Sequence, residues 1–264
     1  MLTYRALTTT LRDQGFGPHS RLLALVDLPA LGPLSGGTEA VLGALLASCE
    51  TLLMPAFTTR CMVVPADGPP GNGLVYGDNG RNLTAEFFTS DLPADADLGP
   101  VAEALRQHPE SARSIHPLYS FAGVGCQDGL ATQTLDDPLS PLAWLADNDG
   151  DVLLLGAGAR ANVALHLAER LAGRKQFVRW ALTPQGVVEC PACPGCSEGF
   201  PAVEQRLRGI ARRAPLGEAA LTWIPLRDLV HITVGWIRED PRALLCDRPD
   251  CPACRDVRAA VRAP

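Results

Sequence analysis

The chain has 264 residues, 47% of them hydrophobic and 20% charged, and carries a formal net charge of -6. This composition is typical of a globular protein with a sizeable core, and the negative charge argues against a general nucleic-acid-binding protein, which is usually basic. Since no run approaches the roughly 20 apolar residues of a membrane span and the N-terminus shows no secretory signal, we expect a cytoplasmic protein that binds neither nucleic acid nor membrane.

Strand-like and helix-like patterns alternate along the first half of the chain. Continuous apolar runs indicate buried strands, and apolar residues three or four apart indicate helices. Thr38 is the expected cap of the second helix. Residues 61–100 are instead rich in Gly, Pro, Asn and Asp, which predicts a long surface loop, either a solvated acidic loop or a lip that binds cations. The predicted helices are residues 3–15, 39–49, 98–108 and 139–146, and the predicted strands are residues 22–28, 51–58 and 120–124.

Residues 151–173 contain a predicted strand, a glycine turn and a helix in succession. Gly156 and Gly158 free the backbone for a tight turn, and ligands of α/β proteins gather at such junctions. The Gly-Ala-Gly turn is not a complete dinucleotide or P-loop fingerprint. His166 lies near the start of the helix, with Glu169 about one turn further on the same face. A lone helical histidine is more often structural than functional, so this residue needs further support.

The remainder of the chain contains shorter patterns. Residues 177–182 and 186–189 are typical of a hairpin, residues 200–213 of an amphipathic helix, and residues 221–236 combine strand and helix signals. Strands that alternate with helices predict an α/β fold. We expect one α/β domain over residues 1–264, whose C-terminal part, residues 187–264, carries clustered cysteines.

Six of the cysteines form two groups near the C-terminus. An odd total of nine does not favour a full disulfide framework. Cys193 and Cys196 form one Cys-x-x-Cys pair, and a second pair lies at Cys251 and Cys254. Two such pairs supply the four thiolates of a structural zinc site when their segments are neighbours in the fold, and such a zinc would hold the C-terminal tail to the domain. An iron–sulfur cluster is a weaker interpretation, whereas reduced, unligated thiols are an equal alternative to zinc. With the spare ligands included, the candidate metal ligands are Cys190, Cys193, Cys196, Cys246, Cys251 and Cys254.

Several segments, taken in order, resemble the aminoglycoside 3-N-acetyltransferase family. Each is common alone, and the ordered set is fairly specific. The resemblance implies a three-layer α/β/α fold with a central mixed sheet, and transfer of an acetyl group from acetyl-coenzyme A to an amine of a cationic aminosugar. The segments are residues 30–37 (ALGPLSGG), 53–58 (LMPAFT), 113–122 (RSIHPLYSFA), 140–142 (SPL), 152–156 (VLLLG) and 165–169 (LHLAE).

The resemblance also implies roles for particular residues. The histidine of the LHLAE segment, His166, becomes the general base, and Glu169 orients its ring or holds the substrate ammonium group. An amine is mostly protonated at neutral pH and attacks a thioester only after losing a proton, which a neutral imidazole accepts. The resemblance places the following residues along the coenzyme A cleft: Leu31, Gly32, Gly36, Gly37, Ser114, His116 and Ser120.

The chain departs from the family pattern at three places. Residues 25–27 (LVD) replace a His-Ser or His-Thr segment, residues 137–139 (DPL) replace a Gly-Glu, and Val163 replaces a threonine. The alternative hypothesis is therefore a zinc-containing binding or scaffold protein, or a relative that has lost acetyl transfer. Arginines gather around the cysteines, but nearby acidic residues and the net charge make a nucleic-acid-binding protein the lesser form of this alternative.

Overall fold

The computed structural model describes residues 1–77 and 80–261, and its centre is a seven-stranded mixed sheet. Strand β1 runs parallel to both β2 and β6, and all other neighbours pair antiparallel. The order across the sheet is β4 (Ala112–Arg113), β5 (Phe121–Val124), β2 (Thr51–Pro55), β1 (Arg21–Val26), β6 (Asp151–Leu155), β10 (Ala219–Pro225) and β9 (Arg212–Leu216).

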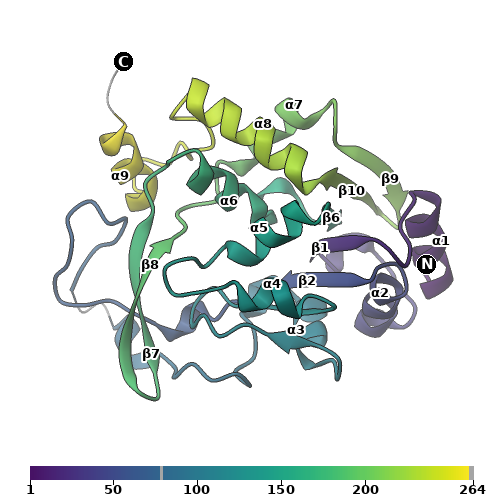
Figure 1. Cartoon of the computed structure of the whole chain (residues 1–264), viewed down its shortest axis with the longest axis horizontal. Helices are drawn as coiled ribbons and strands as arrows, with labels where there is room; N and C mark the ends of the chain where they lie inside the picture. Colours follow the sequence, from purple (N-terminus) through teal and green to yellow (C-terminus); the bar gives the residue numbers. More distant parts are fainter. Residues whose placement is uncertain (78–79, 262–264) are drawn as a thin grey trace.

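Helices cover both faces of this sheet (Figure 1). Successive side chains of a strand point to opposite faces, so Leu23 and Leu25 of β1 enter one core while Leu22 and Ala24 enter the other. The three-layer α/β/α fold that the sequence predicted is therefore confirmed. One layer contains α1 (Tyr4–Asp13), α2 (Gly37–Leu46) and α3 (Pro100–Gln107), and the other contains α4 (Gln127–Ala131), α5 (Ser140–Asp147), α6 (Ala164–Leu171), α7 (Glu204–Leu207) and α8 (Leu226–Glu239).

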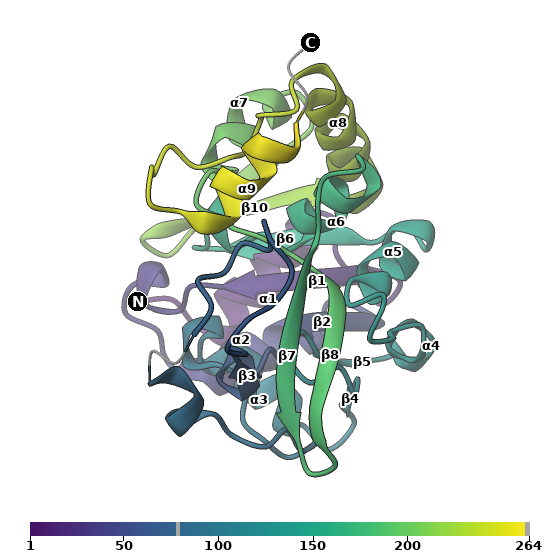
Figure 2. The same cartoon turned by 90° about the vertical axis from the view of Figure 1, so that its left-hand side faces the viewer.

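A second, three-stranded antiparallel sheet stands beside the first, and Figure 2 shows its long hairpin from the front. It consists of β3 (Met62–Val63), β7 (Phe177–Thr183) and β8 (Gly186–Cys193). The pairing of β7 with β8 shifts register between Phe177 and Arg179, and Ala192 opposite this shift has a positive φ of 55°. The C-terminal helix α9 (Pro252–Ala260) packs its Ala253 and Val257 against Phe177.

Two local predictions are wrong. The helix expected at residues 200–213 ends early: the chain forms a 3-10 turn at Phe200–Val203 and α7, and then enters strand β9. Pairing of β9 with β10 at the sheet edge overrides the helical pattern, and Gly209 weakens the helix in between. The second helix begins at Gly37, not behind a Thr38 cap, because Gly36 adopts the left-handed conformation (φ 83°) that glycine tolerates.

The long segment at residues 61–100 has little regular structure, as predicted. Between the 3-10 turn Thr59–Cys61 and the start of α3 at Pro100, its described part contains only β3 and the 3-10 turns Arg81–Thr84 and Ala96–Leu98. Residues 78–79 of this segment lie outside the described residues. Among the described helices, none has the length and apolar character needed to cross a membrane.

Candidate active site

A cleft of about 700 Å³ lies at the carboxyl ends of the three parallel strands. Asp27 follows β1, Phe57 follows β2, and Ala157 and Gly158 follow β6, and all four line the cleft. Strand β1 stands between β2 and β6, with the chain passing to one helical layer after β1 and to the other after β6. Ligands of open α/β sheets bind at such a reversal of strand order.

His166 of α6 lines this cleft and is part of a buried polar chain. Its Nδ1 lies 2.7 Å from Oε2 of Glu169, and the other oxygen of Glu169 accepts a hydrogen bond of 2.6 Å from Arg174. The three side chains are only 10%, 5% and 3% exposed. Because Nδ1 is occupied by the carboxylate, Nε2 is the ring nitrogen left to exchange a proton with a molecule in the cleft.

The turn before α6 explains how this histidine reaches the cleft. Gly156 has φ 69°, and a Cβ atom there would lie 2.9 Å from the carbonyl oxygen of Asp27. The backbone segments that follow β6 and β1 therefore approach each other more closely than a side chain allows. The side chain of Asn162 then accepts the N–H of Ala164 at the start of the helix. The prediction of a glycine-dependent turn is confirmed at Gly156.

The turn at the end of α6 places Arg174 beside Glu169. Gly173 adopts φ 82° directly after α6, and the backbone N–H of Arg174 bonds to the carbonyl of Glu169 at 3.0 Å. The chain thus folds back so that the guanidinium meets the carboxylate of Glu169. Sequence reasoning missed Arg174: Gly173 was visible as a helix end, but helical spacing does not extend past it.

Two later segments support the His166–Glu169 pair from outside the helix. The edge of the Phe200 ring meets the His166 ring, with centroids 4.6 Å apart. Arg174 also donates hydrogen bonds to the carbonyls of Pro241, at 3.0 Å, and Ala243, at 2.6 Å. Since these contacts join residues far apart in sequence, no local pattern could have indicated them.

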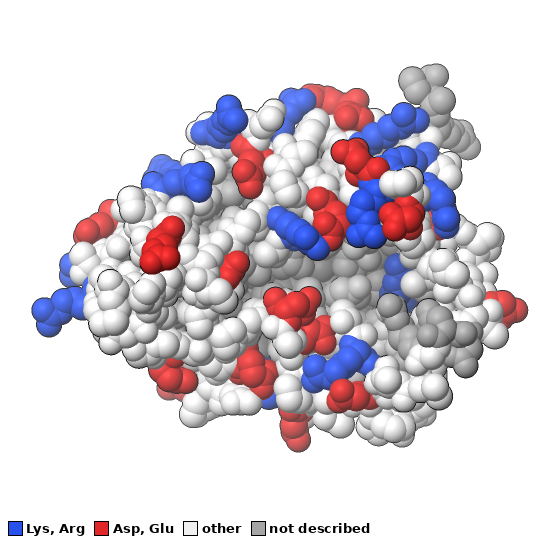
Figure 3. Space-filling view, turned by 180° about the vertical axis from the view of Figure 1, so that it is seen from behind, with Lys and Arg blue, Asp and Glu red and all other residues white. Residues whose placement is uncertain are grey.

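Charged side chains border the cleft. Asp27 and Asp97 line it and are exposed, and Arg160 lines it while paired with Glu198. Figure 3 shows the molecule from behind, where acidic and basic side chains lie on both sides of a hollow across the middle of the surface. Asp97 belongs to the long segment at residues 61–100, so this segment places one carboxylate at the edge of the cleft. Binding of a cation by the segment stays a prediction.

The serine and histidine side chains predicted to contact coenzyme A all have internal partners. The hydroxyl of Ser114 accepts the N–H of Phe121 at 2.8 Å, and that of Ser120 donates to the carbonyl of Ala56 at 2.7 Å. His116 Nδ1 accepts the N–H groups of Leu118 and Tyr119. Burial lowers the pKa of His116 to about 4. These side chains hold the loop around them in shape, and their contact with coenzyme A stays a prediction.

The contact of the glycine-rich turn near α2 with coenzyme A also stays a prediction. Leu31 is fully buried in the core between the sheet and the first helical layer. Gly32, Gly36 and Gly37 have φ values of 75°, 83° and 53°, so all three need the freedom of glycine. None of these four residues is among those that line the described cleft.

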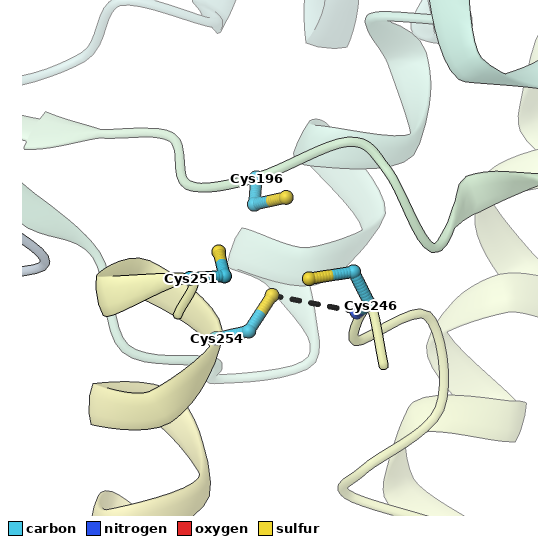
Figure 4. Close-up of side chains that lie close together, drawn as sticks. All are labelled: Cys196, Cys246, Cys251 and Cys254. Carbon is cyan, nitrogen blue, oxygen red and sulfur yellow. Dashed lines mark hydrogen bonds between the residues drawn. The ribbon is translucent and has the colours of Figure 1, made fainter. Parts of the chain in front are cut away.

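The structure separates the clustered cysteines into two sets. The thiols of Cys196, Cys246, Cys251 and Cys254 face one another, with their sulfur atoms all within 4.8 Å (Figure 4). A hydrogen bond with Cys254, the largest cause, lowers the pKa of Cys196 to about 5. All nine cysteines lie in the described part of the chain, and each carries a free thiol.

Cys190 and Cys193 belong instead to a separate apolar cluster with Cys61 and Leu118. The irregularity around Ala192 in β8 turns both side chains to the buried face, and the Cys193 thiol donates to the Cys190 carbonyl. Burial raises the pKa of Cys190 to about 12 and also raises that of Cys193. The expected partnership of Cys193 with Cys196 is therefore not formed, and Cys246 completes the group of four.

A buried histidine–carboxylate pair beside a cleft at the carboxyl ends of parallel strands is typical of an α/β enzyme. A family model described as aminoglycoside 3-N-acetyltransferase matches residues 23–238. The chain belongs to the aminoglycoside 3-N-acetyltransferase family, which confirms the resemblance seen in the sequence, and it is thus a member of a family of N-acetyltransferases.

Relatives and solved structures agree with this assignment. The chain is 29% identical to aminoglycoside N(3)-acetyltransferase VII of Streptomyces paromomycinus, over 90% of this chain and 92% of that protein. It is similar to the crystal structure of aminoglycoside acetyltransferase AAC(3)-IVa, with 28% identity, 98% of both chains covered and a TM-score of 0.77. A His-to-Ala variant of the latter, in complex with a gentamicin, matches with the same identity, coverage and TM-score.

Proposed function

We propose that this protein transfers the acetyl group of acetyl-coenzyme A to an amine of an aminoglycoside, with His166 as the general base. The observation that carries the proposal is the hydrogen bond between His166 Nδ1 and Glu169, which leaves Nε2 as the proton acceptor at the edge of the cleft. The carboxylate fixes the ring orientation and stabilises the imidazolium that forms during the reaction.

The proton balance follows from this arrangement. The amine first gives its ammonium proton to solvent and then attacks the thioester carbonyl carbon, so that a C–N bond forms and the nitrogen loses its second proton to Nε2 of His166. The C–S bond then breaks, and the imidazolium returns the proton to the departing thiolate of coenzyme A. The products are an amide and the free thiol. The turn at Ala157 and Gly158, which lines the cleft, is the candidate source of backbone N–H groups for the intermediate oxyanion.

The charges around the cleft suit a cationic acceptor. Asp27 and Asp97 are exposed, and neither forms an ion pair with an arginine or lysine among the described residues. Arg160, which also lines the cleft, is paired with Glu198. A polycationic aminosugar would thus meet carboxylates without a basic partner on entering the cleft. Solved relatives in complex with a gentamicin and with apramycin bind molecules of this class.

The proposal is tested by measuring release of coenzyme A thiol from acetyl-coenzyme A with a panel of aminoglycosides. We expect turnover with at least one of them and a decrease of about 10²- to 10⁴-fold in kcat for His166→Ala, the usual contribution of a general base. His231→Ala is the matched control, because His231 is exposed on α8 and should leave kcat unchanged. Absence of turnover with every amine, or full turnover by His166→Ala, would refute the proposal and favour an inactive relative or scaffold.

A further inference from the structure

The group of Cys196, Cys246, Cys251 and Cys254 has no part in the chemistry described above. These residues come from two regions of the chain: the loop after β8, and the segment that leads into α9 together with the first turn of that helix. Their sulfur atoms lie within 4.8 Å of one another and converge on one centre (Figure 4). A tetrahedron of Zn–S bonds of about 2.3 Å has sulfur–sulfur edges of about 3.8 Å, so the four side chains need only small rotations to reach that geometry.

Backbone N–H groups contact two of the four sulfur atoms. The sulfur of Cys196 accepts the N–H of Glu198, and the sulfur of Cys254 accepts the N–H of Cys246, both at 3.4 Å. Contacts of this kind outside a metal site orient its ligands. Arg258 donates to the carbonyl of Cys246, which places a positive charge next to a centre that would carry a net charge of about -2 with four thiolates and Zn²⁺.

Other states of the four thiols explain the arrangement less well. A disulfide needs two sulfur atoms about 2.05 Å apart and would use the thiols in pairs, whereas here the four side chains share a single centre. Four free thiols placed around one point would stabilise the fold only slightly, because thiols are weak hydrogen-bond donors and acceptors. An all-sulfur tetrahedral set selects zinc or iron among biological metals, and redox-inactive zinc suits a closed site that holds the fold.

The position of the group links it to the candidate active site. Cys196 is followed by Ser197, which lines the cleft, and Phe200, which packs against His166. Cys246 lies three residues after Ala243, whose carbonyl accepts a hydrogen bond from Arg174. The two segments also press together at Gly199, where an added Cβ would lie 2.3 Å from the carbonyl oxygen of Leu244.

From these contacts we infer that Cys196, Cys246, Cys251 and Cys254 bind one structural Zn²⁺, and that this ion fixes the two segments that hold the His166–Glu169 pair. The ion binds neither substrate. Its role in positioning His166 rests on the proposed acetyltransferase function, whereas the metal site itself does not.

The metal site is tested on the full-length protein, independently of activity. Elemental analysis should find about one zinc per chain, and growth with cobalt should give the intense visible absorption of tetrahedral Co²⁺ thiolate. Cys254→Ser should reduce bound metal at least about fivefold, while Cys193→Ser, which alters an equally buried thiol outside the group, should retain it. Wild-type protein with less than about one-fifth of a zinc per chain, or equal metal content in the two variants, overturns the site.

The positioning role is tested by removing zinc with a chelator under reducing conditions and restoring it. We expect kcat to fall about 10²-fold, the effect of displacing a catalytic group by about 1 Å, and to recover with Zn²⁺, while circular dichroism shows that the helices persist. Full activity in folded, zinc-free protein overturns the positioning role and leaves the site standing. If zinc-loaded protein acetylates no aminoglycoside, the proposed function fails, yet metal content and the cobalt spectrum still decide the site.

Discussion

Arg174 is the residue whose removal tests the architecture of the site most directly. Its side chain is 3% exposed, and its guanidinium donates to Glu169 at 2.6 Å and to the carbonyls of Pro241 and Ala243. Arg174→Gln removes the positive charge and leaves a buried carboxylate with His166 as its remaining partner. Breaking a buried ion pair in this way costs about 3–5 kcal/mol, which corresponds to a fall in Tm of about 6–20 °C at about 2–4 °C per kcal/mol for a domain of this size.

The same substitution should slow catalysis through the position of His166. Without the arginine, the carboxylate of Glu169 loses the hydrogen bond that fixes its second oxygen, so the ring of His166 is held less firmly. We expect kcat to fall about 10²-fold, the effect of displacing a catalytic group by about 1 Å.

Thermal unfolding and the kcat of the purified variant measure both effects. Arg238→Gln is the matched control, since Arg238 is exposed on α8 and its removal should change stability by less than about 0.5 kcal/mol. A wild-type Tm together with a wild-type kcat in Arg174→Gln would show that the arginine neither stabilises the fold nor positions the His166–Glu169 pair.

Three further results are expected. Gly156→Ala should lower the free energy of unfolding by about 1–3 kcal/mol in urea titrations, because φ is 69° and the added Cβ would meet a carbonyl oxygen. Gly158→Ala is the control, since the space around Gly158 is open, and it should change the free energy of unfolding by less than about 0.5 kcal/mol. Equal effects of the two substitutions would contradict the close approach at Gly156. Burial raises the pKa of Cys126 and of Cys190 to about 12, so their stabilising contribution is complete below pH 9 and is lost as pH rises towards 12. Unfolding free energy should thus fall by roughly 1–2 kcal/mol per thiol between about pH 9 and 10.5, and an unchanged slope in Cys126→Ala would exclude that thiol as a cause. Asp27→Asn should raise KM for the aminoglycoside about threefold, which corresponds to the loss of ~0.7 kcal/mol from one exposed ion pair. A KM that is unchanged even at low salt would exclude Asp27 from substrate binding.

The sequence was informative wherever a short-range pattern determined the structure. Residues 152–155 form a buried strand because an apolar run of that length fits the centre of a parallel sheet. His166 and Glu169 meet because residues three apart lie on one face of a helix. The glycine turn between them and the strand follows from the conformation that only glycine adopts without strain.

Tertiary folding determined what the sequence did not reveal. Phe200 and Arg174 reach His166 and Glu169 through turns whose directions no periodicity specifies. Cysteine spacing alone did not distinguish Cys193 from Cys246 as a member of the four-thiol group. An irregular residue pair in β8 decided that difference by turning Cys193 into an apolar cluster.

The order of elements in the sheet has a consequence for synthesis on the ribosome. Strands β1, β2 and β5 and helices α1 to α3 are all complete by residue 124, so the first helical layer and its half of the sheet can begin to pack while the chain is still short. The second neighbour of β6 and the supports of His166 arrive last: β10 ends at Pro225, Ala243 follows, and the last thiol is Cys254. A nascent chain therefore acquires most of its core well before His166 is held in place, and a chain truncated before Cys246 should be compact but inactive.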